Sequence, residues 1–162
     1  MKRFFAATVI LGFLLCSASL AMATQAKDVE PDPGPKDRCP VCGMFVAPFP
    51  SWLSAAVFTD GSVAYFDGPK DLFRFVFDVS KFDAPRTRDQ IASLWVTEYY
   101  TTALVPAAEV NFVAGSDVLG PMGHELVPVL GDEAGQTFLK DHRGEKLLPF
   151  PEVTPAVLEA LR

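Results

Sequence analysis

The chain has 162 residues, of which 49% are hydrophobic and 21% are charged, and its formal net charge is −6. This composition is typical of one globular domain, or of two very small ones that share a core, and it excludes disorder throughout the chain. The negative charge argues against a nucleic-acid-binding surface, which would need clustered Lys and Arg to replace the counterions of the phosphates.

The first 23 residues have the pattern of a secretory signal peptide. A basic start at Met1-Lys2-Arg3 is followed by an apolar run over residues 4–15 and by the small-x-small cleavage site Ala21-Met22-Ala23. The apolar run is too short for a membrane-spanning helix, which needs about 20 residues. We therefore expect cleavage and export to an oxidising compartment. Cys16 ends the apolar run, so a lipid anchor there is an alternative, although Leu15 is larger than the residue that a lipobox favours.

Residues 24–38 and the motif that follows them form the most distinctive stretch of the chain. The leader is rich in proline and in alternating charges, which predicts a flexible segment. The motif Cys39-Pro40-Val41-Cys42-Gly43-Met44 then places two thiols and a thioether within six residues. Gly43 can adopt a turn conformation that brings the sulfur atoms of Cys42 and Met44 to one ion. Soft sulfur ligands at this density favour Cu(I) over harder metals.

Residues 39–82 are predicted to form a first ββα-type unit that carries this motif. Apolar and β-branched residues flank Asp60-Gly61, a pair typical of a type I′ hairpin turn. Asp67 or Gly68 can cap the helix that follows, where a proline occupies the first helical position. Residues 83–92 are then predicted to be a linker. The predicted elements are strands at 55–59 and 62–66 and a helix that begins at Pro69.

Residues 93–162 repeat the order strand, strand, helix and predict a second, ββαβ-type unit. Its loop Gly120-Pro121-Met122-Gly123-His124 offers a thioether and one of the two histidines of the chain. Pro128 confines its own strand to an edge or a bulge of a sheet. The predicted elements are strands at 94–101, 110–113, 125–130 and 146–150, a helix from Asp132 to about His142, and a terminal helix after Thr154. The two halves together predict an α+β fold built of two small, related units.

The Cys-x-x-Cys pair has several possible roles. A structural zinc site would need a second such pair or two histidines at fixed spacing, and the sequence contains neither. A thiol–disulfide oxidoreductase and a local disulfide between Cys39 and Cys42 both remain open. The roles of Met122 and His124 are open as well. They can be metal ligands, or Met122 can fill a gap in the core and His124 can be a polar surface residue.

Four motifs along residues 37–154 occur together in this chain. They are Cys39-Pro40-Val41-Cys42-Gly43-Met44, Tyr65-Phe66-Asp67-Gly68, Val96-Thr97-Glu98-Tyr99-Tyr100 and Gly115-Ser116-Asp117-Val118-Leu119-Gly120-Pro121-Met122-Gly123-His124-Glu125. In combination they resemble the NosL family, the accessory proteins of nitrous oxide reductase. Because the motifs span nearly the whole mature chain, the resemblance is far more specific than a lone Cys-x-x-Cys.

The resemblance implies a periplasmic Cu(I)-binding metallochaperone, not an enzyme, that delivers copper for the assembly of the copper centres of nitrous oxide reductase. Its implied partner is a periplasmic or membrane-associated assembly complex, with the reductase itself as a second candidate. No nucleic acid is expected as a partner, and membrane contact is expected only if Cys16 carries a lipid. The implied fold consists of two small related ββαβ units similar to the organomercurial lyase core.

The resemblance also implies a set of metal ligands. The Cys-x-Met core of the family corresponds to Cys42 and Met44, and Cys39 is an auxiliary thiol. Met122 and His124 lie in the loop from which further ligands are expected. The alternative function, from another class, is a Cys-x-x-Cys thiol–disulfide oxidoreductase of the cell envelope. That activity would require both cysteines, whereas copper binding could survive the loss of Cys39.

Overall fold

The computed structural model describes residues 31–161, so the predicted signal peptide, Cys16 and the first part of the leader lie outside the described residues. The strands are β1 (Ser54–Phe58), β2 (Val63–Phe66), β3 (Ile91–Thr97), β4 (Leu104–Pro106), β5 (Asn111–Ala114), β6 (Leu119–Gly120), β7 (Gly123–His124), β8 (Val127–Val129) and β9 (Lys146–Pro149). The α-helices are α1 (Pro69–Phe77), α2 (Val79–Phe82), α3 (Asp132–Asp141) and α4 (Pro155–Ala160). None of the helices in the described part of the chain is both long and apolar enough to cross a membrane.

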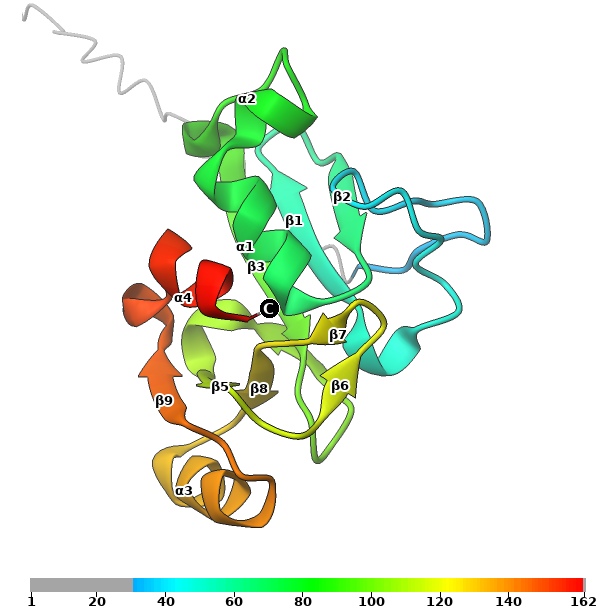
Figure 1. The fold of residues 1–162 in the computed structure, drawn as a ribbon. Coiled ribbons are helices and arrows are strands. Elements are labelled where there is room, and N and C mark those ends of the chain that lie inside the picture. The colour runs from blue at the N-terminus through cyan, green and yellow to red at the C-terminus, as the bar shows by residue number, and fades with distance from the viewer. Residues whose placement is uncertain (1–30, 162) are drawn as a thin grey trace, which may run out of the picture.

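The predicted α+β class is confirmed, with two main sheets and a small hairpin (Figure 1). One sheet has four strands in the order β2-β1-β3-β4, the second has three in the order β8-β5-β9, and β6 pairs with β7. The predicted first hairpin is present, since β1 and β2 pair antiparallel with Ala55 opposite Tyr65. Gly61 in its turn has φ +83°, the left-handed conformation that glycine adopts without strain.

The sheets divide the strands differently from the two predicted units. β3, which sequence analysis placed in the second unit, pairs antiparallel with β1 in the first sheet, with Ala56 opposite Leu94. β4 then adds to the outer edge of β3, with Val96 opposite Val105. The physical reason is that β1 is buried along its whole length. Backbone groups on both of its edges therefore need partners, and β2 satisfies only one edge.

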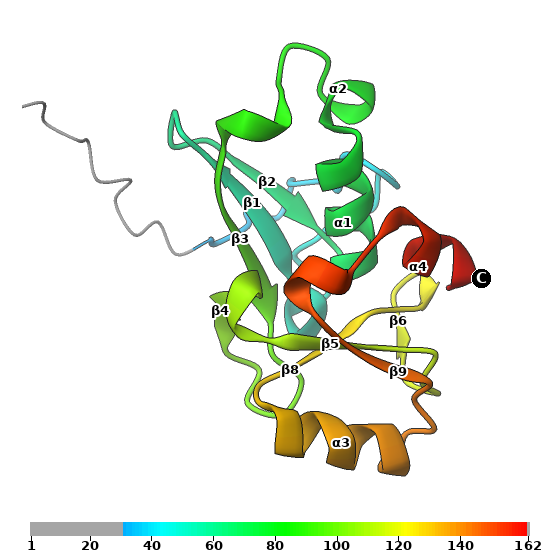
Figure 2. The same ribbon diagram turned by 90° about the vertical axis from the view of Figure 1, so that its left-hand side faces the viewer.

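Helix α1 joins the two sheets into one core. Its Phe73 packs edge-on against Phe112 of β5, with ring centroids 5.0 Å apart, and also contacts Phe150 after β9. Leu72 on the same helix is completely buried. A smaller apolar cluster around Phe138 lies between α3 and the second sheet. Figure 2 shows α1 beside the first sheet and α3 below the second. The helix is thus the element that both halves of the chain share.

The predicted loop at 120–124 is part of a very short hairpin. Gly120 of β6 lies opposite Gly123 of β7, and Pro121 and Met122 form the tip. The chain then enters the core at Glu125, which is buried, and continues into β8. β8 lies at the edge of its sheet, as the proline at its centre requires.

The described end of the leader is held against the first sheet. The Tyr65 hydroxyl donates to the carbonyl oxygen of Asp32 at 3.2 Å, and the N–H of Val46 donates to that of Asp37 at 3.1 Å. Flexibility was predicted for the leader as far as Arg38, but its last residues are anchored. The acceptors are backbone carbonyls, which side-chain composition does not reveal. The cysteine motif therefore starts from a fixed point on the fold.

Candidate metal centre

The cysteine motif is closed by its own backbone into a tight turn. The N–H of Gly43 donates to the carbonyl oxygen of Cys39 at 2.8 Å, and the N–H of Cys39 donates to that of Met44 at 2.9 Å. Gly43 has φ +79°, so the turn conformation expected at this residue is present. On the outside of the turn, the Arg38 guanidinium donates to the carbonyl oxygen of Gly43 and stacks over the ring of Phe45. The turn thus holds both thiols at its base.

The turn is docked on the junction between β2 and α1. The thiol of Cys42 donates to Oδ1 of Asp67 at 3.1 Å, and the thiol of Cys39 donates to Oδ2 of Asp71 at 3.5 Å. Asp67 directly follows β2, and Asp71 lies in the first turn of α1. One sulfur or oxygen atom from each of these four residues lies within 4.8 Å of the others. We call these four residues the thiol–carboxylate cluster.

Sequence analysis found the two cysteines of this cluster and missed both aspartates as ligand candidates. Asp67 was interpreted only as one of two possible caps of the helix, and Asp71 was not singled out, because an acid in the first turn of a helix is ordinary where the dipole favours negative charge. The signal available in the sequence was the pair itself, because two acids four residues apart around a strand–helix junction can face one point. Nothing in the sequence said that the cysteine turn would be that point.

Burial and the two carboxylates keep the thiols protonated. Burial raises the pKa of the Cys42 thiol to about 11, and its hydrogen bond to Asp67 adds to the rise. Cys39 is 1% exposed, and burial raises the pKa of its thiol even further. Both residues are free cysteines in this structure. A metal ion that binds the two sulfur atoms would therefore have to displace protons.

The two carboxylates differ in what balances their charge. Asp71 accepts a hydrogen bond from Arg74 at 2.9 Å, so a cation already faces its second oxygen. Asp67 is 1% exposed, and its Oδ2 is buried without a hydrogen-bond partner among the described residues. A buried acceptor of this kind is costly unless something positive or hydrogen-bonding reaches it. The side of the cluster formed by Cys42 and Asp67 is therefore fitted to receive a cation.

The remaining predicted ligands are Met44, Met122 and His124, which differ in their burial and in their contacts. Met44 is half-buried and lines a shallow hollow together with Cys42 and Phe45. Met122 is 47% exposed at the tip of the β6–β7 hairpin, and the exposed His124 contributes no ligand atom to the cluster. Their backbone is nevertheless close to α1, because both carbonyl oxygens accept hydrogen bonds from the Lys70 ammonium. Metal ligation by Met44, Met122 and His124 stays a prediction.

Replacing Asp67 with asparagine should lower the pKa of Cys42 by about one unit, because a neutral amide no longer opposes ionisation of the thiol. At about pH 8 the thiolate fraction then rises about 10-fold. The lower intrinsic nucleophilicity of the thiolate offsets part of this gain, so alkylation by iodoacetamide should become about 3-fold faster. Asp71→Asn is the matched comparison and should have a smaller effect, because Asp71 raises the pKa of Cys42 less than Asp67 does and already faces Arg74. An unchanged rate in Asp67→Asn would contradict the electrostatic role of Asp67.

Together, the fold and the cluster define a class of protein: an α+β protein with two free thiols, backed by carboxylates at a sheet–helix junction, in an arrangement that could hold a thiophilic metal ion. The chain belongs to the NosL family, whose family model matches residues 31–158. The resemblance found in the sequence motifs is thereby confirmed.

The fold is also found among solved structures. The chain is similar to the crystal structure of the copper chaperone NosL from Shewanella denitrificans, with a TM-score of 0.67 and 24% sequence identity. The comparison covers 78% of this chain and 96% of that chain. At this level of identity the likeness shows that the fold is shared. A search of the curated proteins gave no match.

Proposed function

We propose that the protein is an exported Cu(I) chaperone that supplies copper for the assembly of the copper centres of nitrous oxide reductase. The observation that carries this proposal is the thiol–carboxylate cluster, in which two thiols lie beside two carboxylates. One of these carboxylates, Asp67, has a buried oxygen without a hydrogen-bond partner among the described residues. Membership of the NosL family supports copper as the metal, as does the likeness to a protein described as a copper chaperone.

The donor set favours Cu(I) because its ligands are soft. Thiolates and thioethers select Cu(I) over hard divalent cations. In this proposal Cys42 and Met44 form the core of the site, and Cys39 supplies a second thiolate from inside the turn. Met122 and His124 are the proposed further ligands, which the β6–β7 hairpin would contribute from the second half of the chain.

The exposure of the site suits a carrier that must release its cargo. Cys39 is buried, whereas Cys42 and Met44 are only half-buried and line the same shallow hollow. A thiolate or thioether of a partner can therefore approach the ion from this side. Transfer would then proceed by ligand exchange, with the ion briefly shared between Cys42 and the partner, so that it is never released into solution.

The protonation of the thiols distinguishes this proposal from a thiol–disulfide oxidoreductase. A redox-active cysteine needs a lowered pKa, because the thiolate is the attacking species. Here burial raises the pKa of both thiols, and the carboxylate beside Cys42 adds to that rise. A cation that replaces the protons removes this obstacle, whereas a disulfide substrate does not. Carriage of a metal ion is therefore favoured over an enzymatic redox role.

The proposed location and partners follow from the signal-peptide pattern and the family. We place the protein in the periplasm, with an outer-membrane lipid anchor only if Cys16 is acylated. Its proposed partner is a periplasmic or membrane-associated complex that assembles copper sites, and the reductase itself is a second candidate. The anchor can be checked by feeding radiolabelled palmitate to cells that express the wild type or Cys16→Ser. If Cys16 is acylated, the wild type incorporates the label and Cys16→Ser does not.

Anaerobic titration of the mature protein tests the metal and its ligands, and it should show one Cu(I) bound per chain. Met44→Leu keeps the size of the side chain but removes the thioether, so the affinity should fall by at least about 10-fold, the effect of losing even a supporting partner of a ligand. The Cu(I) affinities of Met122→Leu and His124→Ala test in the same way whether the hairpin contributes ligands. Wild-type affinity in both hairpin variants would remove Met122 and His124 from the ligand set.

A further inference from the structure

Helix α1 is capped by a residue from the other half of the chain. Gly68 at the N-cap position has no side chain that could accept a hydrogen bond from the first turn. Glu125 takes this role, since its Oε1 accepts the N–H of Lys70 at 2.6 Å and that of Leu126 at 2.8 Å. Glu125 is 2% exposed. A side-chain oxygen in this place satisfies an N–H group that the first turn of the helix leaves free.

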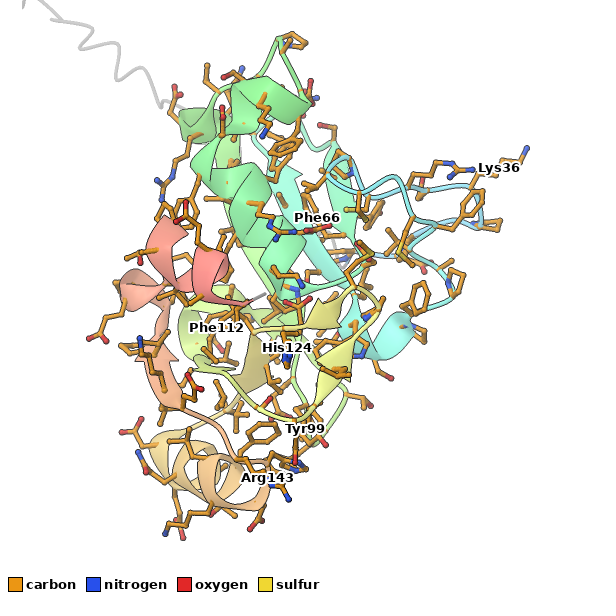
Figure 3. All side chains as sticks on the ribbon, in the orientation of Figure 1. Lys36, Phe66, Tyr99, Phe112, His124 and Arg143 are labelled. Atoms are coloured by element: carbon orange, nitrogen blue, oxygen red, sulfur yellow. The ribbon has the colours of Figure 1, made fainter. Side chains whose placement is uncertain are left out.

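Lys70 makes the return connection from the helix to the β6–β7 hairpin. Its side chain is buried, and Nζ donates to the carbonyl oxygen of Met122 at 3.0 Å and to that of His124. The next residue, Asp71, accepts the hydrogen bond from Cys39. Figure 3 places His124 where the hairpin meets the beginning of α1. We call Glu125 and Lys70 the latch, because together they join the hairpin to the first turn of α1, which carries Asp71 of the cluster.

The hairpin has little else that could keep it in place. It contains only two residue pairs, Leu119 with His124 and Gly120 with Gly123. A two-stranded hairpin of this kind is marginal by itself in water. Leu119 and Met122 are both exposed, so neither anchors it through burial. The position of the hairpin therefore depends on the hydrogen bonds of the latch.

Gly68 shows how closely the latch fits the helix. A Cβ atom added to Gly68 would lie 2.3 Å from Oε2 of Glu125, which is far inside the contact distance. The φ angle of Gly68 is −179°, an extended conformation that any residue can adopt. Alanine at this position therefore collides with the Glu125 side chain, which has to shift, and it causes no backbone strain. The substitution Gly68→Ala should displace Glu125 without altering any residue of the latch.

We propose that Glu125 and Lys70 are positioning residues of the metal centre, which hold the β6–β7 hairpin against the first turn of α1 and thereby slow the release of the bound ion. The metal in this inference rests on the proposed function, whereas the latch itself can be tested without metal.

Amide hydrogen exchange of the metal-free protein tests the latch. Glu125→Ala should speed exchange across residues 119–126 by at least about 10-fold, because the hairpin opens locally. Glu125→Gln keeps an oxygen acceptor in the same place and should change exchange much less. Introduced into the wild type, Gly68→Ala should speed exchange as Glu125→Ala does. Introduced into the Glu125→Ala protein, it should add nothing, because the side chain with which it collides is gone. Wild-type exchange in Glu125→Ala, or simple additivity of the two alanine substitutions, would overturn the latch.

Transfer of Cu(I) from the loaded protein to a chromogenic chelator tests the effect on the metal centre. Release should be about 10-fold faster in Glu125→Ala and in Gly68→Ala, the size expected for partners that orient ligands, and close to wild type in Glu125→Gln. Phe138→Leu, in the separate cluster beside α3, is the control for a general loss of stability and should leave release unchanged. Faster exchange with unchanged release would overturn the positioning role. A wild type that binds no Cu(I) would overturn the proposed function, while the exchange result would still decide the latch.

Discussion

Replacing Cys42 with serine is expected to weaken Cu(I) binding by more than about 100-fold, which exceeds the loss caused by removing a supporting partner of a ligand. Cys42 donates to Oδ1 of Asp67, whose Oδ2 has no hydrogen-bond partner among the described residues, and it shares the shallow hollow with Met44. A serine hydroxyl is a hard ligand of almost the same size, so the turn and its hydrogen bond to Asp67 can persist. Anaerobic competition with a Cu(I) chelator of known affinity measures the change.

Cys39→Ser provides the matched comparison within the same turn. Cys39 is deeply buried, and its strongly raised pKa means that more free energy is needed to remove its proton when a metal binds. The net gain from its thiolate is therefore smaller, and we expect a loss of no more than about 10-fold. If both Cys42→Ser and Met44→Leu bound Cu(I) with wild-type affinity, the copper assignment would be refuted. Dithiol exchange activity that needs both cysteines would support the oxidoreductase instead.

The apparent affinity for Cu(I) is expected to rise steeply with pH. Each thiol that becomes a ligand gives up one proton, so the affinity increases about 10-fold per pH unit for each thiolate formed. The pKa of Cys42 is raised to about 11, and that of Cys39 is raised further, so both thiols hold their protons at neutral pH. Between about pH 6 and about pH 8, two thiolate ligands therefore predict an increase of about 100-fold per unit.

The slope of this dependence counts the thiolates. Cys39→Ser should reduce it to about 10-fold per unit, because only Cys42 then loses a proton on binding. The sign follows from competition: lowering the pH restores the protons that the metal must displace, so affinity falls and release is favoured. Chelator competition at several pH values measures the slope, after correction for the titration of the chelator. A slope of zero would mean that neither cysteine binds the metal as a thiolate.

Local patterns were sufficient for much of the fold. The turn at Asp60-Gly61, the start of α1 at Pro69 and the edge position of the strand around Pro128 were all predicted from residue type and spacing, and the structure confirms them. These features depend on backbone preferences that neighbouring residues determine among themselves. The grouping of strands into sheets was not predictable in this way, because β3 pairs with the free edge of β1, a strand more than 30 residues earlier in the chain.

The candidate site also has a part that local sequence predicts and a part that only the tertiary fold creates. Its thiols and thioether lie within six residues, so the sequence alone identified them and indicated a soft metal. Asp67 and Asp71 escaped notice because acids near the start of a helix have an ordinary explanation. The connection of the β6–β7 hairpin to α1 was invisible for another reason. It relies on two backbone carbonyl oxygens and on a glutamate 55 residues away from the N–H group that it caps.

By itself, the sequence determined the family, the α+β class and the Cys-x-x-Cys-Gly-Met turn, because each depends on residues that are close together in the chain or on motifs that can be matched in order. Only the tertiary structure decided which groups surround the sulfur atoms. The thiols meet Asp67 and Asp71 because the anchored leader places the turn on the β2–α1 junction. Burial at that junction then sets the protonation of both thiols, and burial is a property of the packed fold.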